Sequence, residues 1–234
     1  MRADTTFSDR IILAIDDTSL DKIRWVMRET SPLIRTYKIG SISFTAFGPR
    51  LIDEVMSFGK DVFLDLKYFD IPNTVYRAVR QAASFGVKMA TLHTLGGREM
   101  LKRSLEASDG RVMLLGVTLL TSMDAEEADG VGLRGGVQDI VGRLASLAVQ
   151  AGLHGLVASG HEVPRLKEEF GGLTIVVPGI RPRERGAPAD DQKRVVTPRQ
   201  AFESGADYIV IGRPVTENDD PARVLSEICD GLRK

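Results

Sequence analysis

The sequence predicts an α/β protein that folds as a (β/α)8 barrel, the TIM barrel, in a single domain spanning residues 1–234. Three observations lead to this prediction. Eight short apolar segments recur along the chain, stretches with helical periodicity separate them, and 234 residues suit a one-domain barrel. The apolar segments do not alternate cleanly between apolar and polar residues, which is typical of parallel strands buried on both faces.

The predicted strands and helices alternate throughout the chain. The strand candidates are IILAI from Ile11, IRTYKIG from Ile34, DVFLDL from Asp61, VKMATLH from Val87, RVMLLGVTLL from Arg111, HGLVAS from His154, LTIVVPG from Leu173 and DYIVIG from Asp207. The helix candidates are residues 19–30, 50–60, 73–86, 97–108, 137–152, 162–171, 197–206 and 221–234. An open doubly wound sheet is the alternative, but no GxGxxG follows the first strand. Two connections, residues 121–136 and 180–197, are longer than a barrel needs and predict functional loops.

The charge balance argues against nucleic-acid and membrane partners. Lys and Arg number 31 against 32 Asp and Glu, so the formal net charge is −1 and no global field attracts a polyanion. No apolar run approaches the roughly 18 residues of a membrane span, and the N-terminus lacks the apolar core of a signal peptide. Cys229, the one cysteine, cannot form an intramolecular disulfide. We therefore expect a cytoplasmic protein whose anion sites are local.

Polar residues gather where the predicted strands end. They are Asp16 after the first strand, Lys38 in the second, Asp65 and Lys67 in the third, His93 in the fourth, Thr121 and Ser122 after the fifth, Arg181 after the seventh and Arg213 after the eighth. A barrel brings these ends to one face, where its active site lies. His93 has no second His or Cys at ligand spacing, so we assign it no metal and no other role.

Asp65, Lys67 and Asp70 in the segment DLKYFDIPNT are the candidate catalytic residues. Asp65 and Lys67 are two apart on a strand, so their side chains share a face and can pair. A buried salt bridge with a structural role is the alternative, although such pairs are weak stabilisers. Asp70 has an alternative role as the N-cap of the next helix. Two carboxylates around one lysine would hold it as an ammonium and make it a fixed proton donor.

The loops after the seventh and eighth strands, VVPGIRP and VIGRPVT, predict a phosphate site. Barrels frequently bind phosphate with these two loops. Gly179 and Gly212 let backbone N–H groups approach an anion, while Arg181 and Arg213 supply forked donors. Loop glycines beside solvated arginines are the alternative interpretation. Together with the catalytic segment, these loops indicate an enzyme that acts on a phosphorylated small molecule.

These residues also carry a family resemblance. DLKYFDIPNTV, AIDD after the first strand, YKIG in the second, VTLLTS after the fifth, PGIR after the seventh, DQKRVVTP in the long loop and IGRPVT after the eighth occur in family order. On these motifs the sequence resembles the bacterial orotidine 5′-phosphate decarboxylases across essentially its whole length. It departs from the family at Tyr68 or Phe69, where a His is common, and there we expect altered surroundings with unchanged chemistry.

The resemblance implies cofactor-independent decarboxylation of orotidine 5′-phosphate to UMP and CO2, in pyrimidine synthesis, by a homodimer with shared active sites. It implies Lys38, Asp65, Lys67 and the partner's Asp70 as the catalytic residues, with Lys67 as the proton donor to C6. The substrate-binding residues that it implies are Asp16, Lys38, Asp65, Ile71, Pro72, Asn73, Thr74, Thr121, Ser122, Arg181, Gln192, Gly212 and Arg213. We expect no metal and no cofactor.

Two other functions remain open on the sequence. Relatives of this barrel use a similar Asp, Lys, Asp motif with Mg²⁺ to decarboxylate or condense sugar phosphates, and they need a carboxylate near the end of the second strand. Lys38 occupies that place, and an ammonium there opposes a divalent cation. A non-catalytic phosphoribosyl-binding barrel would need only the phosphate loops, so the candidate catalytic residues argue against it.

Overall fold

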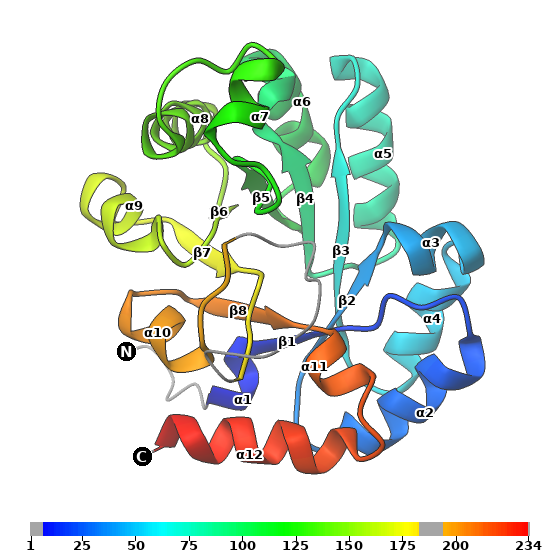
Figure 1. Cartoon of the computed structure of the whole chain (residues 1–234). Coiled ribbons are helices and arrows are strands. Elements are labelled where there is room, and N and C mark those ends of the chain that lie inside the picture. The colour runs from blue at the N-terminus through cyan, green and yellow to red at the C-terminus, as the bar shows by residue number, and fades with distance from the viewer. Residues whose placement is uncertain (1–6, 183–193, 234) are drawn as a thin grey trace.

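Eight parallel strands close into a barrel in sequence order, with β1 paired to both β2 and β8 (Figure 1). The structure is a computed structural model and describes residues 7–182 and 194–233. Over these residues the strands are β1 Ile11–Ala14, β2 Thr36–Gly40, β3 Asp61–Tyr68, β4 Met89–His93, β5 Met113–Val117, β6 Gly155–Val157, β7 Thr174–Val177 and β8 Tyr208–Ile211. Every strand coincides with a predicted segment, which confirms the (β/α)8 barrel.

The helices surround the barrel (Figure 1). In the described ranges they are α1 Phe7–Arg10, α2 Leu20–Thr30, α3 Ser41–Phe47, α4 Arg50–Ser57, α5 Pro72–Ser84, the 3-10 turn η1 Thr94–Gly96, α6 Gly97–Ser108, α7 Ala125–Gly130, α8 Val137–Ala151, α9 Val163–Glu169, α10 Pro198–Glu203, α11 Arg213–Thr216 and α12 Pro221–Arg233. Each of the eight predicted helices has a counterpart among them. No helix in the described part of the chain is long and apolar enough to cross a bilayer.

Two apolar layers hold the barrel together. Side chains that point inward form a buried cluster in the barrel, made of Ile12, Phe63, Met89, Leu115, Val176 and Val210. A larger cluster of buried side chains lies between the strands and the surrounding helices. Strands buried on both faces need apolar residues at successive positions, which explains why the strand segments read as continuous apolar runs.

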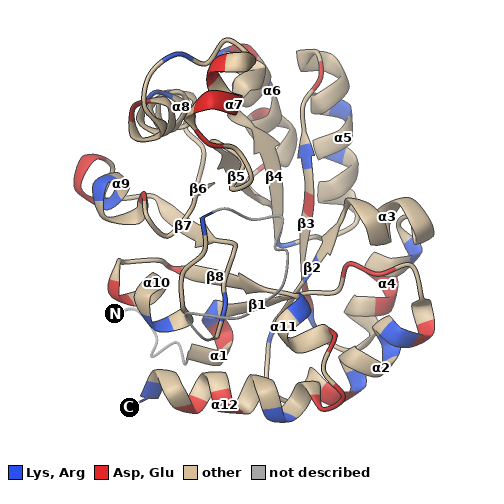
Figure 2. Ribbon diagram, in the orientation of Figure 1, with Lys and Arg blue, Asp and Glu red and all other residues tan. Residues whose placement is uncertain are grey.

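The connection after β5 is more ordered than the sequence predicted. β5 ends at Val117, before the last three residues of the predicted strand, and the expected irregular loop contains α7. Asp124 caps α7 by accepting from the Glu127 N–H, while the Glu127 carboxylate accepts from the Asp124 N–H. This reciprocal pair is a capping box, and its Asp-x-x-Glu pattern was readable in the sequence. In Figure 2 the ribbon of α7 is red where its acidic residues lie.

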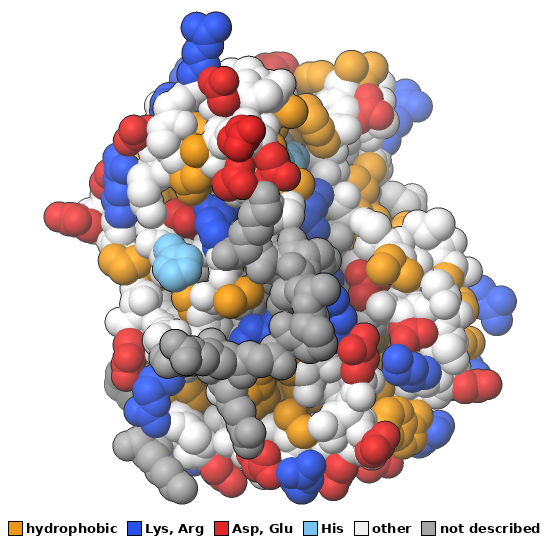
Figure 3. Space-filling model, viewed as in Figure 1, with side chains coloured by type: hydrophobic (Ala, Val, Ile, Leu, Met, Phe, Trp, Pro, Cys, Tyr) orange, Lys and Arg blue, Asp and Glu red, His pale blue; other side chains and the backbone are white. Residues whose placement is uncertain are grey.

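Ion pairs lie at the N-terminal end of the barrel, far from the predicted site. Asp61, the first residue of β3, accepts from Lys88 at 2.6 Å and from Arg35 at 2.8 Å. The remaining charges are mostly spread over the outer helices, and Figure 3 shows both signs interspersed on the visible face. Half-exposed pairs of this kind contribute little to stability individually.

Candidate active site

A cavity of about 510 Å³ opens at the C-terminal ends of the strands. Nine of the predicted site residues line it, namely Asp16, Lys38, Asp65, Lys67, Thr121, Gly179, Arg181, Gly212 and Arg213. Its floor includes Phe63 and Val210, which belong to the apolar cluster inside the barrel. The cavity therefore combines an apolar base with charged walls, as expected for a site that binds a polar small molecule.

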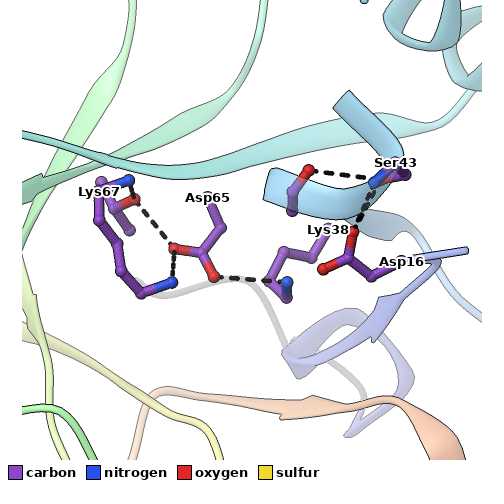
Figure 4. Close-up of polar contacts among 7 residues, drawn as sticks. Asp16, Lys38, Ser43, Asp65 and Lys67 are labelled. Atoms are coloured by element: carbon purple, nitrogen blue, oxygen red, sulfur yellow. Dashed lines mark hydrogen bonds and ion pairs between the residues drawn. The ribbon is translucent and has the colours of Figure 1, made fainter. Parts of the chain in front are cut away.

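The Asp65 carboxylate lies at the centre of a charged network (Figure 4). Its Oδ1 is 3.0 Å from the Lys67 ammonium, and its Oδ2 is 3.4 Å from the Lys38 ammonium. The Thr91 hydroxyl also donates to Oδ1 at 3.0 Å. The side chains of Asp65 and Lys38 are only 13% and 12% exposed, whereas that of Lys67 is 39% exposed and faces the cavity.

Opposing effects act on the Asp65 carboxyl. Burial by itself would raise the pKa of Asp65. The positive charges of Lys38 and Lys67, with hydrogen bonds from Lys67 and Thr91, outweigh burial and lower the pKa below its ordinary value. Asp65 is therefore ionised at neutral pH and provides a fixed negative charge between two ammonium groups.

The backbone is irregular at the catalytic segment. Leu64 pairs with Ala90 and Tyr68 pairs with Leu92, so the chain from residue 64 to 68 of β3 faces the shorter stretch from 90 to 92 of β4. Within this bulge Lys67 has φ 47°, in the left-handed region, which costs a non-glycine residue about 1–2 kcal/mol. Strand alternation predicted that Asp65 and Lys67 share a face. The two side chains do pair, but through a bulge and not through a regular strand.

Asp16, just beyond the end of β1, accepts hydrogen bonds from the N-terminus of α3. Its Oδ1 accepts from the Ser43 N–H at 2.8 Å and from the Ser43 hydroxyl at 3.0 Å (Figure 4). A Cβ on Gly40 would come within 2.2 Å of Asp16 Oδ2, so a side chain at position 40 would displace the carboxylate. The glycine that ends β2 is thus needed for the close approach of Asp16 to α3.

The two loops predicted to bind phosphate meet on one wall of the cavity. Gly179, with φ 74°, and Arg181 follow β7, while Gly212 and Arg213 follow β8, and all four line the cavity. Gly212 is the cap residue before α11. This wall lies on the barrel side formed by β7, β8 and β1, away from the Lys67 side chain on β3, which suits a substrate with its phosphate remote from its reacting atom.

Several predicted substrate-binding residues do not line the cavity of their own chain. Ile71, Pro72, Asn73 and Thr74 lie at the start of α5, and Ser122 is exposed in the connection after β5. Gln192 lies outside the described residues. Within one chain, the cavity is therefore built from the ends of the strands and not from α5.

Asp70 is not the N-cap that its position suggested. Ile71 is the cap residue of α5, and the exposed Asp70 carboxylate accepts from the Ile71 N–H at 2.6 Å. Asp70 forms no ion pair with Lys67 in the described part of the chain. Phe69 and Ile71, on either side of it, are 61% and 66% exposed. The exposed carboxylate thus lies between two exposed apolar residues along the chain.

His93, the last residue of β4, contacts the catalytic segment from the side. Its ring lies 5.7 Å from the ring of Phe69, and its Nδ1 accepts from the Leu95 N–H at 3.4 Å. Burial, followed by the positive charge of Lys67, lowers the pKa of His93. The neutral His93 ring therefore lies beside the segment in a tilted contact with Phe69, which with Tyr68 is one of the two positions where the family commonly has a His.

Three groups that support the cavity carry no recognisable pattern in the sequence. They are Thr91 on β4, Ser43 on α3, and the buried ion pair of Glu162 with Arg194. Among the described residues, no group of three or more His, Cys, Asp or Glu side chains is placed to hold a metal ion. Residues such as Thr91 carry no pattern in one sequence, because a buried threonine is an ordinary strand residue.

The fold and the cavity together define a class of protein, the (β/α)8 barrels with a charged small-molecule site at the C-terminal face. The sequence profile of the orotidine 5′-phosphate decarboxylase / HUMPS family matches residues 9–228, and the chain belongs to this family.

Individual relatives are orotidine 5′-phosphate decarboxylases that match nearly the whole chain. An orotidine 5′-phosphate decarboxylase of Nitrosospira multiformis is 47% identical over 221 residues, covering 94% of this chain and 92% of the relative. One of Pseudoalteromonas translucida is 44% identical over 226 residues, covering 94% of this chain and 96% of the relative. The crystal structure of orotidine 5′-phosphate decarboxylase from Lactobacillus acidophilus superimposes with a TM-score of 0.82 at 31% identity, covering 97% of this chain and all of that one.

Proposed function

We propose that the chain decarboxylates orotidine 5′-phosphate to UMP and CO2, a step of pyrimidine synthesis. The observation that carries this proposal is the Asp65 carboxylate held between Lys38 and Lys67 at the cavity wall. Relatives with the named activity match nearly the whole length of the chain. The network supplies what a decarboxylation needs, namely a fixed positive charge and a proton beside the carbon that loses its carboxylate.

Lys67 is the proposed proton donor. When the C–C bond to the carboxylate breaks, its electron pair stays on C6 in the plane of the pyrimidine ring, where the ring delocalises it poorly. The Lys67 ammonium stabilises the developing negative charge and then gives its proton to C6, while CO2 departs. Lys67 has the most exposed side chain of the three and lines the cavity, so it is suited to reach the substrate.

Asp65 and Lys38 organise the proton donor. Asp65 is ionised, and its 3.0 Å contact with Lys67 fixes where the ammonium points. Its charge would also face the carboxylate of the bound substrate. Lys38 balances that charge from the other side at 3.4 Å. We therefore propose Lys38, Asp65 and Lys67 as the part of the catalytic network that one chain provides.

The cavity walls suit the rest of the substrate. We propose that Asp16 and Lys38 bind the ribose hydroxyls, since a carboxylate accepts and an ammonium donates hydrogen bonds. Thr121 or Ser122 would contact the base. Gly212, Arg213 and Gln192 would hold the phosphate with Arg181 nearby, because glycine backbone and guanidinium groups bind such anions well.

We also propose a cytoplasmic homodimer of single-domain chains with shared active sites. The exposed apolar side chains of Phe69 and Ile71 belong to the catalytic segment, and contact with a second copy would remove them from water. In that arrangement the partner's Asp70 would complete the network around Lys67. Pro72, Asn73 and Thr74, which lie outside the cavity of their own chain, would reach the partner's substrate together with Ile71.

The proposed reaction uses no metal and no cofactor. The specific support is Lys38, whose ammonium group lies 3.4 Å from Asp65. An ammonium in that place repels a divalent cation that would otherwise use the Asp65 carboxylate as a ligand.

The direct test is an absorbance assay with purified protein and orotidine 5′-phosphate in metal-free buffer. We expect loss of the orotate absorbance and formation of UMP in equal amounts. Orotidine without the phosphate should react far more slowly, because binding energy from the remote phosphate serves the chemical step. If the protein leaves orotidine 5′-phosphate unchanged with and without Mg²⁺, the proposed function is wrong.

A further inference from the structure

We propose that Thr91 is a positioning residue of this active site, whose hydroxyl holds both the Lys67 backbone and the Asp65 carboxylate in place. The inference rests on the proposed function and adds to it a residue that does not line the cavity. Thr91 lies in the middle of β4, fully buried, beside the bulge that carries the catalytic segment.

The hydrogen bonds of Thr91 have only one possible direction. The Lys67 N–H lies 2.8 Å from Thr91 Oγ1, and Thr91 Oγ1 lies 3.0 Å from Asp65 Oδ1. A backbone N–H can only donate, so the hydroxyl accepts from Lys67. An ionised carboxylate can only accept, so the single hydroxyl proton points to Asp65. Thr91 is thus oriented from both sides and has no spare proton for another arrangement.

These bonds close a ring around the proton donor. Asp65 Oδ1 accepts from the Thr91 hydroxyl and also from the Lys67 ammonium, each at 3.0 Å. The backbone and the side-chain terminus of Lys67 are therefore tied to the same pair of groups. A shift of the Lys67 backbone breaks the bond to Thr91, and a rotation of Asp65 breaks the bonds to both residues.

The Lys67 backbone needs such support because it is strained. Its φ of 47° lies in the left-handed region, which only glycine adopts without cost. The register shift also takes Lys67 out of the regular ladder between β3 and β4. The Thr91 side chain accepts from the Lys67 N–H, so this donor is paired although it lies outside the ladder. Since Thr91 is fully buried, water does not compete for either bond.

The test is Thr91→Val, which keeps the branched shape and removes the hydroxyl. We expect kcat to fall about tenfold to a hundredfold, the range that corresponds to losing a hydrogen bond to a charged group. KM should change little, because Thr91 does not line the cavity and so makes no contact of its own with the substrate. Thr91→Ser, which restores the hydroxyl, should recover most of the lost kcat.

Thr94→Val is the matched control. Thr94 is also fully buried and follows the same strand, but its hydroxyl donates to the Val117 carbonyl at 2.8 Å and does not contact Lys67 or Asp65. Both valine variants should lower stability to unfolding by urea to a similar extent, whereas only Thr91→Val should lower kcat strongly. Equal losses of kcat in the two variants, or no rescue by Thr91→Ser, would overturn the proposal.

A crystal structure of the Thr91→Val protein tests the proposal without relying on turnover. We expect Lys67 to leave the left-handed region or its ammonium to move away from Asp65. An unchanged Lys67 backbone and an unchanged contact with Asp65 would refute the positioning role. A wild-type protein without activity on orotidine 5′-phosphate would instead refute the proposed function, so the two failures are distinguishable.

Discussion

Arg194 and Glu162 form a buried ion pair, with Arg194 Nη1 2.7 Å from Glu162 Oε1. Arg194 Nη2 also donates to the carbonyls of Leu119 and Leu120 at 3.2 and 2.8 Å, and Glu162 Oε2 accepts from the Ser159 N–H at 2.8 Å. The pair therefore joins the segments that follow β5, β6 and β7. Leu119 and Leu120 line the cavity, so the pair braces a wall of the candidate site.

Arg194→Ala is expected to destabilise the fold by about 3–5 kcal/mol, the usual cost of removing one partner of a buried ion pair. The Glu162 carboxylate would remain in a site that is 1% exposed, without its counter-charge. Urea unfolding measures the change. Arg165→Ala is the control, because Arg165 also pairs with a glutamate, Glu169, but at the exposed surface, where the loss should be small.

The loss of unfolding free energy in the Arg194→Ala protein should depend on pH. Burial raises the pKa of Glu162 despite the opposing charge of Arg194, so the folded state retains a proton at pH values where the unfolded chain has lost it. The stability that the Glu162 carboxyl contributes is fully present below its pKa in the unfolded chain. It is lost as the pH rises through its pKa in the folded protein. The loss of unfolding free energy caused by Arg194→Ala should therefore become smaller as the pH is lowered and Glu162 becomes neutral. A loss of unfolding free energy that stays constant with pH would contradict the raised pKa of Glu162.

Lys67→Ala should abolish turnover while leaving UMP affinity within about one order of magnitude, because the lost interaction is made mainly in the transition state. Turnover comes from the absorbance assay, and UMP affinity comes from calorimetry. Lys88→Ala is a matched control, since Lys88 pairs with Asp61 on the same strand but at the opposite end of the barrel. Substantial turnover by the Lys67→Ala protein would sink the assignment of Lys67 as the proton donor.

Treatment with EDTA should leave the activity unchanged, and added Mg²⁺ should not increase it. The physical reason is the Lys38 ammonium beside Asp65, which provides the positive charge that a metal would otherwise supply. The measurement is the initial rate before and after dialysis against the chelator. Activity that disappears with EDTA and returns with Mg²⁺ would favour the metal-dependent alternative.

His93 should make stability fall as the pH is lowered. Burial and the charge of Lys67 lower its pKa from the ordinary 6.5, so the unfolded chain takes up a proton at a higher pH than the folded one. The stability that His93 contributes is fully present above its pKa in the unfolded chain. It is lost as the pH falls through its pKa in the folded protein. Urea unfolding of His93→Gln at several pH values should show a weaker dependence than wild type. His161→Gln, on the surface, is the control.

The barrel could be predicted from the sequence because its signals are repeated. Eight apolar segments and eight amphipathic ones each give an independent indication of the same unit, and the residues at strand ends follow from that topology. The position of Lys67 on a strand could be predicted for the same reason.

The contacts that orient the site residues could not be predicted. The bulge at Lys67 arises from a register shift between β3 and β4, and no residue type in the segment requires a positive φ. Thr91 and Glu162 act through partners 24 and 32 residues away along the chain, so no local pattern connects them. The Thr91 contacts depend on the register between β3 and β4, which a single sequence does not specify.

The proposed homodimer with shared active sites predicts that two inactive variants can rescue each other. Lys67→Ala and Asp70→Ala proteins should each be inactive, because each homodimer lacks one of the two groups at both sites. In a mixed dimer, the Lys67 of the Asp70→Ala chain meets the intact Asp70 of the Lys67→Ala chain, so one site of the two is complete. Random exchange at equal amounts makes about half of the dimers mixed, and about a quarter of wild-type activity should return.

The control is a mixture of the Lys67→Ala and Asp65→Ala proteins. Both variants remove a group of one chain's own network, so their mixed dimer has no complete site. Recovery in the first mixture and none in the second would place Asp70 across the interface. Failure of both mixtures, with subunit exchange verified, would place it in its own chain's site.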